Sequence, residues 1–172
     1  MSFTDIAISR RSVRKFLDES IAPELIDSLL IAAQAAPSAG NRQPWHFYAI
    51  SDRELIGRIA NESLGQSFAA KAPLMIVVCA DAERSAAGYG QRGRELYCLQ
   101  DTAAAVQNIL LCAHDMGLGA CWCGAFSEEN LAERLDIPAH LRPVAIIPVG
   151  HPAHSPAARP RRPLSEIVTF ID

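Results

Sequence analysis

Residues Leu74 to Ala80, with the sequence Leu-Met-Ile-Val-Val-Cys-Ala, form the longest apolar run in this chain of 172 residues. The run has the length of a strand and is rich in β-branched side chains, which favour extended backbone. An apolar run without polar alternation is typical of a strand that is buried on both faces. We therefore predict that this stretch is the central strand of a sheet.

Helical and extended patterns surround this central run. Pro148 removes a backbone donor from the last expected strand, so we expect it at a sheet edge or a strand end. The polar stretch 82–94 contains three glycines and is expected to be a loop, a candidate lid. Few strands among many helices indicate an α+β fold with mixed strand directions. Apolar spacing predicts helices at about 23–36, 52–61, 96–116 and 127–135, and strands at about 46–50, 120–125 and 144–149.

The composition changes after Gly150. Residues 151–163 are rich in proline and arginine and cannot build a core, whereas Glu166 to Ile171 is apolar again. The length is that of one domain, so we expect residues 1–172 to form a single domain with an extended arm at about 151–172. An apolar strand at the end of this arm could join the sheet of a second copy. A frayed tail is the alternative.

Charge and hydropathy exclude several classes of protein. The net charge of −3 argues against general nucleic-acid binding, which requires a basic surplus. No apolar stretch approaches the length of a membrane span. Arg10, Arg11, Arg14 and Lys15 stand where a signal peptide would be apolar, so we expect a cytoplasmic protein.

Arginines with alternating spacing are the first candidate binding element. Arg10, Ser12 and Arg14 would point to one side of an extended segment, and Arg159 and Arg161 show the same alternation. The guanidinium group is a planar fork of donors that matches phosphate oxygens. The pattern indicates a phosphate site, although a solvated basic surface would have the same composition.

Two further segments could contact a flat ligand. The loop from Pro37 to Trp45 contains small residues that let backbone approach a ring, and Asn41 can both donate and accept hydrogen bonds. The segment Gly119 to Phe126 combines small residues with Trp122 at an expected strand end. Each segment alone could also be an ordinary connection or a buried strand.

Other motifs carry less weight. Gly88 to Gly93 fits the letters G-x-G-x-x-G, but it does not directly follow a strand, so a Rossmann dinucleotide site is not expected. The five cysteines indicate buried thiols, and the single residue between Cys121 and Cys123 is too short a spacing for zinc. No metal site, Ser/His/Asp arrangement or carboxylate pair is predicted.

Taken in order, these segments resemble the nitroreductase family of flavoproteins over nearly the whole chain. Larger members carry a glutamate where this chain has Gly124, together with a long insertion before the late helix, so the resemblance is to the compact branch. The matching segments are Arg10 to Phe16, Pro37 to Trp45, Arg92 to Tyr97 with Gln100 and Asp101, Gly117 to Trp122, and Arg159 to Leu164.

The resemblance implies an intertwined α+β homodimer, with a mixed sheet flanked by helices, C-terminal strand exchange and two FMN sites at the interface. It assigns the FMN phosphate to Arg10, Arg11, Ser12, Arg14, Arg159 and Arg161. It assigns the isoalloxazine to a loop lent by the partner, Pro37, Ser38, Ala39 and Asn41, and to Trp122, Cys123, Gly124 and Ala125 near N5. Gln66 is assigned to the pyrimidine edge.

The implied activity is hydride transfer from NADH or NADPH through FMN to a small acceptor such as a nitroaromatic or quinone, by a ping-pong mechanism. FMN would carry the chemistry, which explains why no catalytic side chain is predicted. Three alternatives stay open: a dedicated flavin reaction on one metabolite (dehalogenation, desaturation or flavin fragmentation), a flavin storage protein without turnover, and a thiol redox protein using Cys121 and Cys123.

Overall fold

The predicted central strand lies inside the sheet. The computed structural model describes residues 2–63 and 65–171, and in it every side chain from Leu74 to Ala80 is at most 1% exposed. Among these residues, four strands form one sheet in the order β1-β2-β4-β3. The strands are β1 (Trp45–Ile50), β2 (Leu74–Asp81), β3 (Gly119–Ala120) and β4 (Leu141–Gly150).

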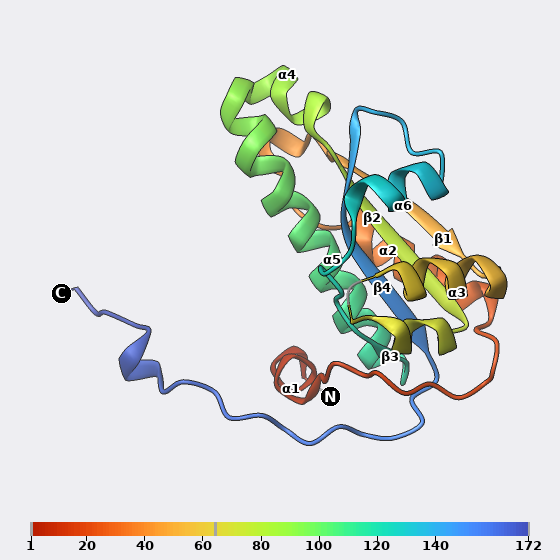
Figure 1. Ribbon diagram of the computed structural model, residues 1–172. Helices are drawn as coiled ribbons and strands as arrows, with labels where there is room; N and C mark the ends of the chain where they lie inside the picture. Colours follow the sequence, from red (N-terminus) through yellow and green to blue (C-terminus); the bar gives the residue numbers. More distant parts are fainter. Residues whose placement is uncertain (1, 64, 172) are drawn as a thin grey trace.

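Helices cover both faces of this sheet (Figure 1). Leu74, Ile76 and Val78 of β2 pack against α2 and α5 on one face. Met75 and Val77 point to the other face and pack against α3, η2 and α6. The two layers explain why β2 is apolar from Leu74 to Cys79, since these side chains enter the two cores alternately. The helices are α2 (Pro23–Gln34), α3 (Arg53–Glu62), η2 (Ser67–Lys71), α5 (Cys98–Asp115) and α6 (Glu128–Arg134).

The four helices predicted from apolar spacing are confirmed to within about two residues at most of their ends. The strands predicted at 46–50 and 74–80 are confirmed as well. β4 is longer than predicted, because it begins at Leu141. Pro148 lies two residues before the end of β4, as expected for a strand end, and its register partner is Met75 of β2.

Two predictions about the sheet were wrong. The named strands pair only in antiparallel fashion, so the sheet is not mixed. Parallel pairing within the described residues is limited to one bridge between Ser12 and Ala120. The strand predicted at 120–125 shrinks to Gly119–Ala120, followed by a separate bridge from Cys123 to Ile146.

The prediction of a loop at 82–94 was also wrong. The segment forms α4 (Ala82–Arg92) and a π-helical turn, η3 (Gly93–Tyr97). The Asp81 carboxylate accepts a hydrogen bond from the backbone amide of Arg84 and so caps the N-terminus of α4. Gly90 has φ +56° and bends the helix, and a Cβ at Gly93 would lie 2.5 Å from the Ser85 carbonyl oxygen. These glycines permit a kink and a close helix contact, and do not mark a loop.

The C-terminal arm leaves the body after a short anchored section. The Leu17 amide donates to the His151 carbonyl at 2.8 Å, and the Ala153 amide donates to the Lys15 carbonyl at 3.0 Å. Beyond this point the arm extends away from the body (Figure 1). The strand predicted at Glu166 to Ile171 is not formed in the single chain, where η4 (Leu164–Glu166) is followed by irregular backbone.

Across residues 2–63 and 65–171, the helices fall short of the length and hydropathy that crossing a lipid bilayer requires.

Candidate functional site

The segment Arg10 to Arg14 is held extended beside the short strand β3. It follows α1 (Phe3–Ser9), pairs through Ser12 with Ala120, and the Val13 amide donates to the Ala120 carbonyl at 3.0 Å. Val13 is buried at 7% exposure and occupies the space that a side chain on Gly119 would fill. Because neighbouring side chains on extended backbone point to opposite sides, Ser12 and Arg14 face away from the core.

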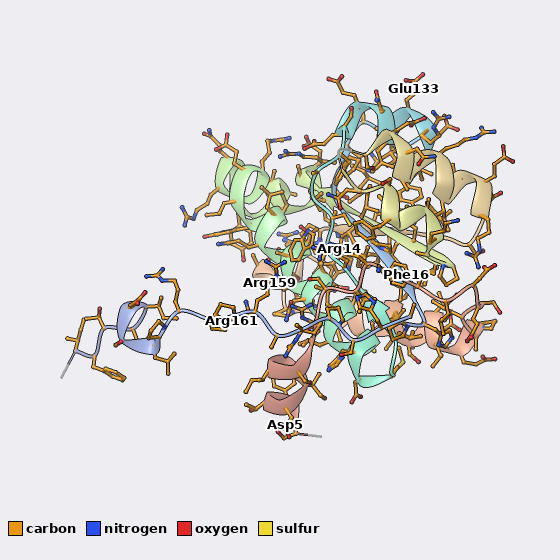
Figure 2. All side chains as sticks on the ribbon, turned by 60° about the horizontal axis from the view of Figure 1, so that its bottom comes forward. Asp5, Arg14, Phe16, Glu133, Arg159 and Arg161 are labelled. Carbon is orange, nitrogen blue, oxygen red and sulfur yellow. The ribbon has the colours of Figure 1, made fainter. Side chains whose placement is uncertain are left out.

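The predicted phosphate residues lie around one groove. This open hollow of about 1000 Å³ runs between α1 with the segment that follows it and residues 156–161 of the arm. In Figure 2, Arg159 and Arg161 follow the arm where it passes the body that carries Arg14. The structure thus brings together two arginine groups that are about 150 positions apart. All six predicted residues line the groove: Arg10, Arg11, Ser12, Arg14, Arg159 and Arg161.

The groove has a strong surplus of positive charge. Burial and the charges of Arg161 and Arg11 lower the pKa of the half-buried Arg10 guanidinium. Among the described residues, no carboxylate forms an ion pair with Arg10, Arg14, Arg159 or Arg161. Like charges held together without a counter-charge favour binding of an anion.

Arg11 differs from the other groove arginines. Its Nη1 donates to the carbonyls of Ile8 and Ser9 at 2.8 Å each and to its own neighbour Arg10 at 3.0 Å. These carbonyls lie at the C-terminal end of α1, where orphan acceptors need donors. Arg11 therefore closes the helix in this structure, although its side chain also lines the groove.

The side chain of Cys121 is packed against the arginine segment. Cys121 is 1% exposed, and its pKa is lowered to about 7 by a hydrogen bond from Cys123, with further contributions from Arg14, a Ser12 hydrogen bond and Arg10. Burial opposes this shift. The pKa of the equally buried Cys123 is raised, because its proton is shared with Cys121 and a second ionisation would place two negative charges together.

The residues around Cys123 alternate between core and surface. The Cys123 side chain is buried beneath the sheet, while its backbone pairs with Ile146. Trp122 is 42% exposed, and Gly124 and Ala125 are exposed on the same stretch. A Cβ added at Gly124 would meet nothing within 4 Å, so the backbone there is open to a ligand.

The loop after α2 has a defined shape set by α5. The Ala39 amide donates to both carboxylate oxygens of Asp101 at 3.2 Å, and the Gln43 amide donates to Ser38 Oγ at 2.9 Å. Burial raises the pKa of Asp101, and the amide hydrogen bond opposes that shift. This role of Asp101 was not predicted from the sequence. The signal was an acidic residue in the apolar stripe of a long helix.

The loop and the groove remain separate within one chain. Gly40 and Asn41, which adopt φ near +55°, line a second hollow with α4, and no described residue lines both hollows. The structure therefore does not bring the predicted isoalloxazine residues Pro37, Ser38, Ala39 and Asn41 to the arginine groove of the same chain. Gln66 is half-buried and lies two residues before Phe68, whose ring centroid is 5.7 Å from the Arg14 guanidinium.

The sequence of this chain matches a known protein family and several of its members. The family model described as "Nitroreductase family" matches residues 7–71 and 60–151. A Methanothermobacter thermautotrophicus protein, whose name pairs NADH dehydrogenase with NAD(P)H nitroreductase, is 38% identical over 156 residues, covering 88% of this chain and 78% of that protein. The "FMN reductase (NADPH)" of Bacillus subtilis is 31% identical over 169 residues, covering 91% and 68%.

A solved structure also matches the fold. The nitroreductase family protein from Clostridium novyi NT superposes with a TM-score of 0.81 at 34% identity, covering 92% of this chain and 89% of that one. The family model covers most of the chain, including the arginine segment, the loop after α2 and the strand end at Cys121. The chain belongs to the nitroreductase family.

Proposed function

We propose that residues 1–172 form a single FMN-binding domain of an oxidoreductase that uses NADH or NADPH to reduce a small acceptor such as a nitroaromatic or a quinone. The names of the similar proteins, which include NAD(P)H nitroreductase and FMN reductase, support this class of activity. The observation that carries the proposal is the arginine groove, where Arg10 and Arg161 face each other with no carboxylate partner among the described residues.

The residues of the groove fit the phosphate end of FMN. A phosphate dianion accepts several charge-assisted hydrogen bonds, and Arg10, Arg14, Arg159 and Arg161 supply forked donors around one hollow. Ser12 lines the same wall, and its hydroxyl, which hydrogen-bonds to Cys121 in the ligand-free chain, would turn to donate to the phosphate. The charge surplus and the volume of the groove both suit a ligand that carries a phosphate.

The neighbouring strand end suits a flat ring. Trp122 offers an exposed aromatic face, while Gly124 leaves backbone uncovered next to Ala125. Amides at these positions would donate to a ring nitrogen, and Cys123 would hold the strand end in the core. We place Gln66 at the other edge of the ring, because it precedes the segment that packs Phe68 on Arg14.

When bound, FMN supplies reversible hydride transfer, so reductant and acceptor can use one pocket in turn, as in a ping-pong mechanism. The work of the chain is to hold the phosphate, orient the ring and leave one face accessible. In this proposal Arg10 and Arg14 bind the phosphate and Ser12 orients it. Asp101 fixes the loop after α2 by accepting a hydrogen bond from the Ala39 amide. No side chain of this set needs to transfer a proton to carbon.

We also propose a homodimer in which residues 151–172 reach the partner. The end of the arm exposes apolar side chains that a monomer would leave in water: Leu164 is 73%, Phe170 87% and Ile171 92% exposed. Covering such a segment with the edge of a second sheet would bury this area and pair its backbone. In the same dimer, the loop of Pro37, Ser38, Ala39 and Asn41 would complete the partner's site.

Anaerobic titration tests the activity. The purified yellow protein is mixed with NADH or NADPH, and bleaching of the flavin is followed by its recovery on adding a quinone, a nitroaromatic or another acceptor. We expect bleaching with at least one nicotinamide and steady turnover with an acceptor. A protein that retains FMN but bleaches with neither nicotinamide contradicts the proposal and supports the storage alternative.

The FMN site has a separate test. The double variant Arg10→Ala/Arg14→Ala should be purified colourless, because two charge-assisted contacts of about 1.5–3 kcal/mol each are lost. The matched control is Arg53→Ala/Arg58→Ala, which removes two surface arginines already paired with Asp18 and Glu54. Stoichiometric FMN in the first variant would show that the phosphate lies elsewhere.

A further inference from the structure

A second hollow lined by arginines lies between the loop after α2 and α4. It measures about 640 Å³ and is formed by η1 (Ala39–Asn41) and its flank on one side and α4 on the other. Its polar lining comes from Asn41, Arg42, Arg84 and Tyr89. Neither arginine lines the arginine groove, and no role was predicted for either from the sequence.

The walls of this hollow fit together closely. A Cβ at Gly88 would lie 2.7 Å from Arg42 Nε and 2.9 Å from Nη2, so a side chain there would displace this guanidinium from its place along α4. A Cβ at Gly40 would lie 2.5 Å from the Tyr89 hydroxyl. Arg84 Nε donates to the Arg42 carbonyl at 2.6 Å, which joins α4 to the loop. The residues that line the hollow are all exposed, so it is an open surface concavity whose shape is set by these contacts between the loop and α4.

The charge of the hollow is not balanced by its neighbours. Among the described residues, neither Arg42 nor Arg84 forms an ion pair with a carboxylate. The acidic residues near Arg84 in the sequence already have other partners. Glu83 forms an ion pair with Arg94, and the Asp81 carboxylate accepts a hydrogen bond from the backbone amide of Arg84. Two guanidinium forks therefore line an open space without a counter-charge.

We propose that this hollow, defined by Arg42 and Arg84 with Asn41 and Tyr89, binds an oxyanion carried by a substrate, either a phosphate monoester or a carboxylate. The inference deepens the proposed function and rests on it, because the substrate is the reductant or the acceptor of the proposed reaction. The loop that lines this hollow is the one proposed to complete the partner's FMN site. NADPH differs from NADH by one phosphate monoester, so such a site would select NADPH. A carboxylate on the acceptor has the same hydrogen-bonding pattern.

Kinetics and direct binding together test the site. The variants Arg42→Gln and Arg42→Gln/Arg84→Gln are compared with Arg58→Gln, a surface arginine paired with Glu54. For each, kcat and KM are measured with NADPH and NADH, and with 4-nitrobenzoate and nitrobenzene as acceptors. Binding of 2′-AMP, 4-nitrobenzoate and uncharged adenosine is followed by NMR. Flavin absorbance and thermal unfolding are used to check that each variant is folded. If the double variant does not fold, Arg42→Gln alone tests the site.

The phosphate form of the proposal predicts that kcat/KM for NADPH falls by about tenfold or more per arginine, relative to NADH, with loss of 2′-AMP binding. The carboxylate form predicts the same loss for 4-nitrobenzoate relative to nitrobenzene. If both ratios equal those of Arg58→Gln and neither anion binds the wild type, the proposal is overturned. Absence of wild-type turnover with every substrate would contradict the proposed function instead, and anion binding would then decide the site independently.

Discussion

Replacement of Arg161 by glutamine separates the stability of the ligand-free protein from its affinity for FMN. Burial and the charge of Arg161 lower the pKa of Arg10, so the two like charges repel each other in the ligand-free site. Removing one of them should leave the free energy of unfolding within about 0.5 kcal/mol of the wild type, or raise it slightly. The same change should weaken FMN binding, because a bound phosphate would lose one charged donor.

The magnitude follows from the contact that is lost. One hydrogen bond to a charged group contributes about 1.5–3 kcal/mol, which corresponds to an increase of about 10- to 150-fold in Kd. Ligand stabilisation depends on the logarithm of ligand concentration over Kd, so the stabilisation by FMN falls by the same energy. For a chain of this size, the rise in Tm on adding FMN should shrink by about 3–12 °C.

The assay is thermal unfolding with and without FMN, supported by calorimetric titration. Arg162→Gln is the matched control, because Arg162 lies next to Arg161 on the arm but pairs with Glu166 at 3.1 Å and does not line the groove. An unchanged Kd for Arg161→Gln would refute the reasoning. So would a ligand-free Tm well below that of the control, since it would mean that Arg161 stabilises the empty fold.

Three further predictions concern other parts of the structure. Asp101→Ala should lower the free energy of unfolding by about 1–3 kcal/mol in urea, since the Ala39 amide loses its acceptor, whereas Asp101→Asn, which keeps one acceptor oxygen, should lose less; equal losses would contradict this. The pKa of Cys121 is lowered to about 7 from 9.0, so its thiolate should stabilise the wild type relative to Cys121→Ser. This advantage should grow between about pH 7 and 9 and be lost as the pH falls through 7. Tm measured against pH would show it, and parallel curves for the two proteins would disprove the thiolate. Deleting the residues after Arg162 should weaken the dimer in sedimentation, and an unchanged dimer would exclude strand exchange.

Local patterns in the sequence were sufficient for most elements of the fold. The unbroken apolar run at Leu74 to Ala80 predicted a doubly buried strand, and helical spacing predicted α2, α3, α5 and α6, because side-chain periodicity and burial are local and strongly coupled. Arg10, Ser12 and Arg14, which alternation predicted on one side of an extended segment, all line the groove, but Arg11 between them lines it as well. The loop predicted from the glycines of α4 was wrong, because these glycines allow a close helix contact and a bend in the helix.

The sequence by itself determined which chemical groups are available and the elements that carry them. Only the tertiary structure decided which groups meet: Arg10 with Arg161, Cys121 with the arginine segment, and Asp101 with the Ala39 amide. These pairs are separated by about 60 to 150 positions, and they meet because the arm passes the arginine segment, that segment lies beside β3, and the loop after α2 lies beside α5. Propensity and periodicity act within a few residues, so they contain no information about such distant encounters.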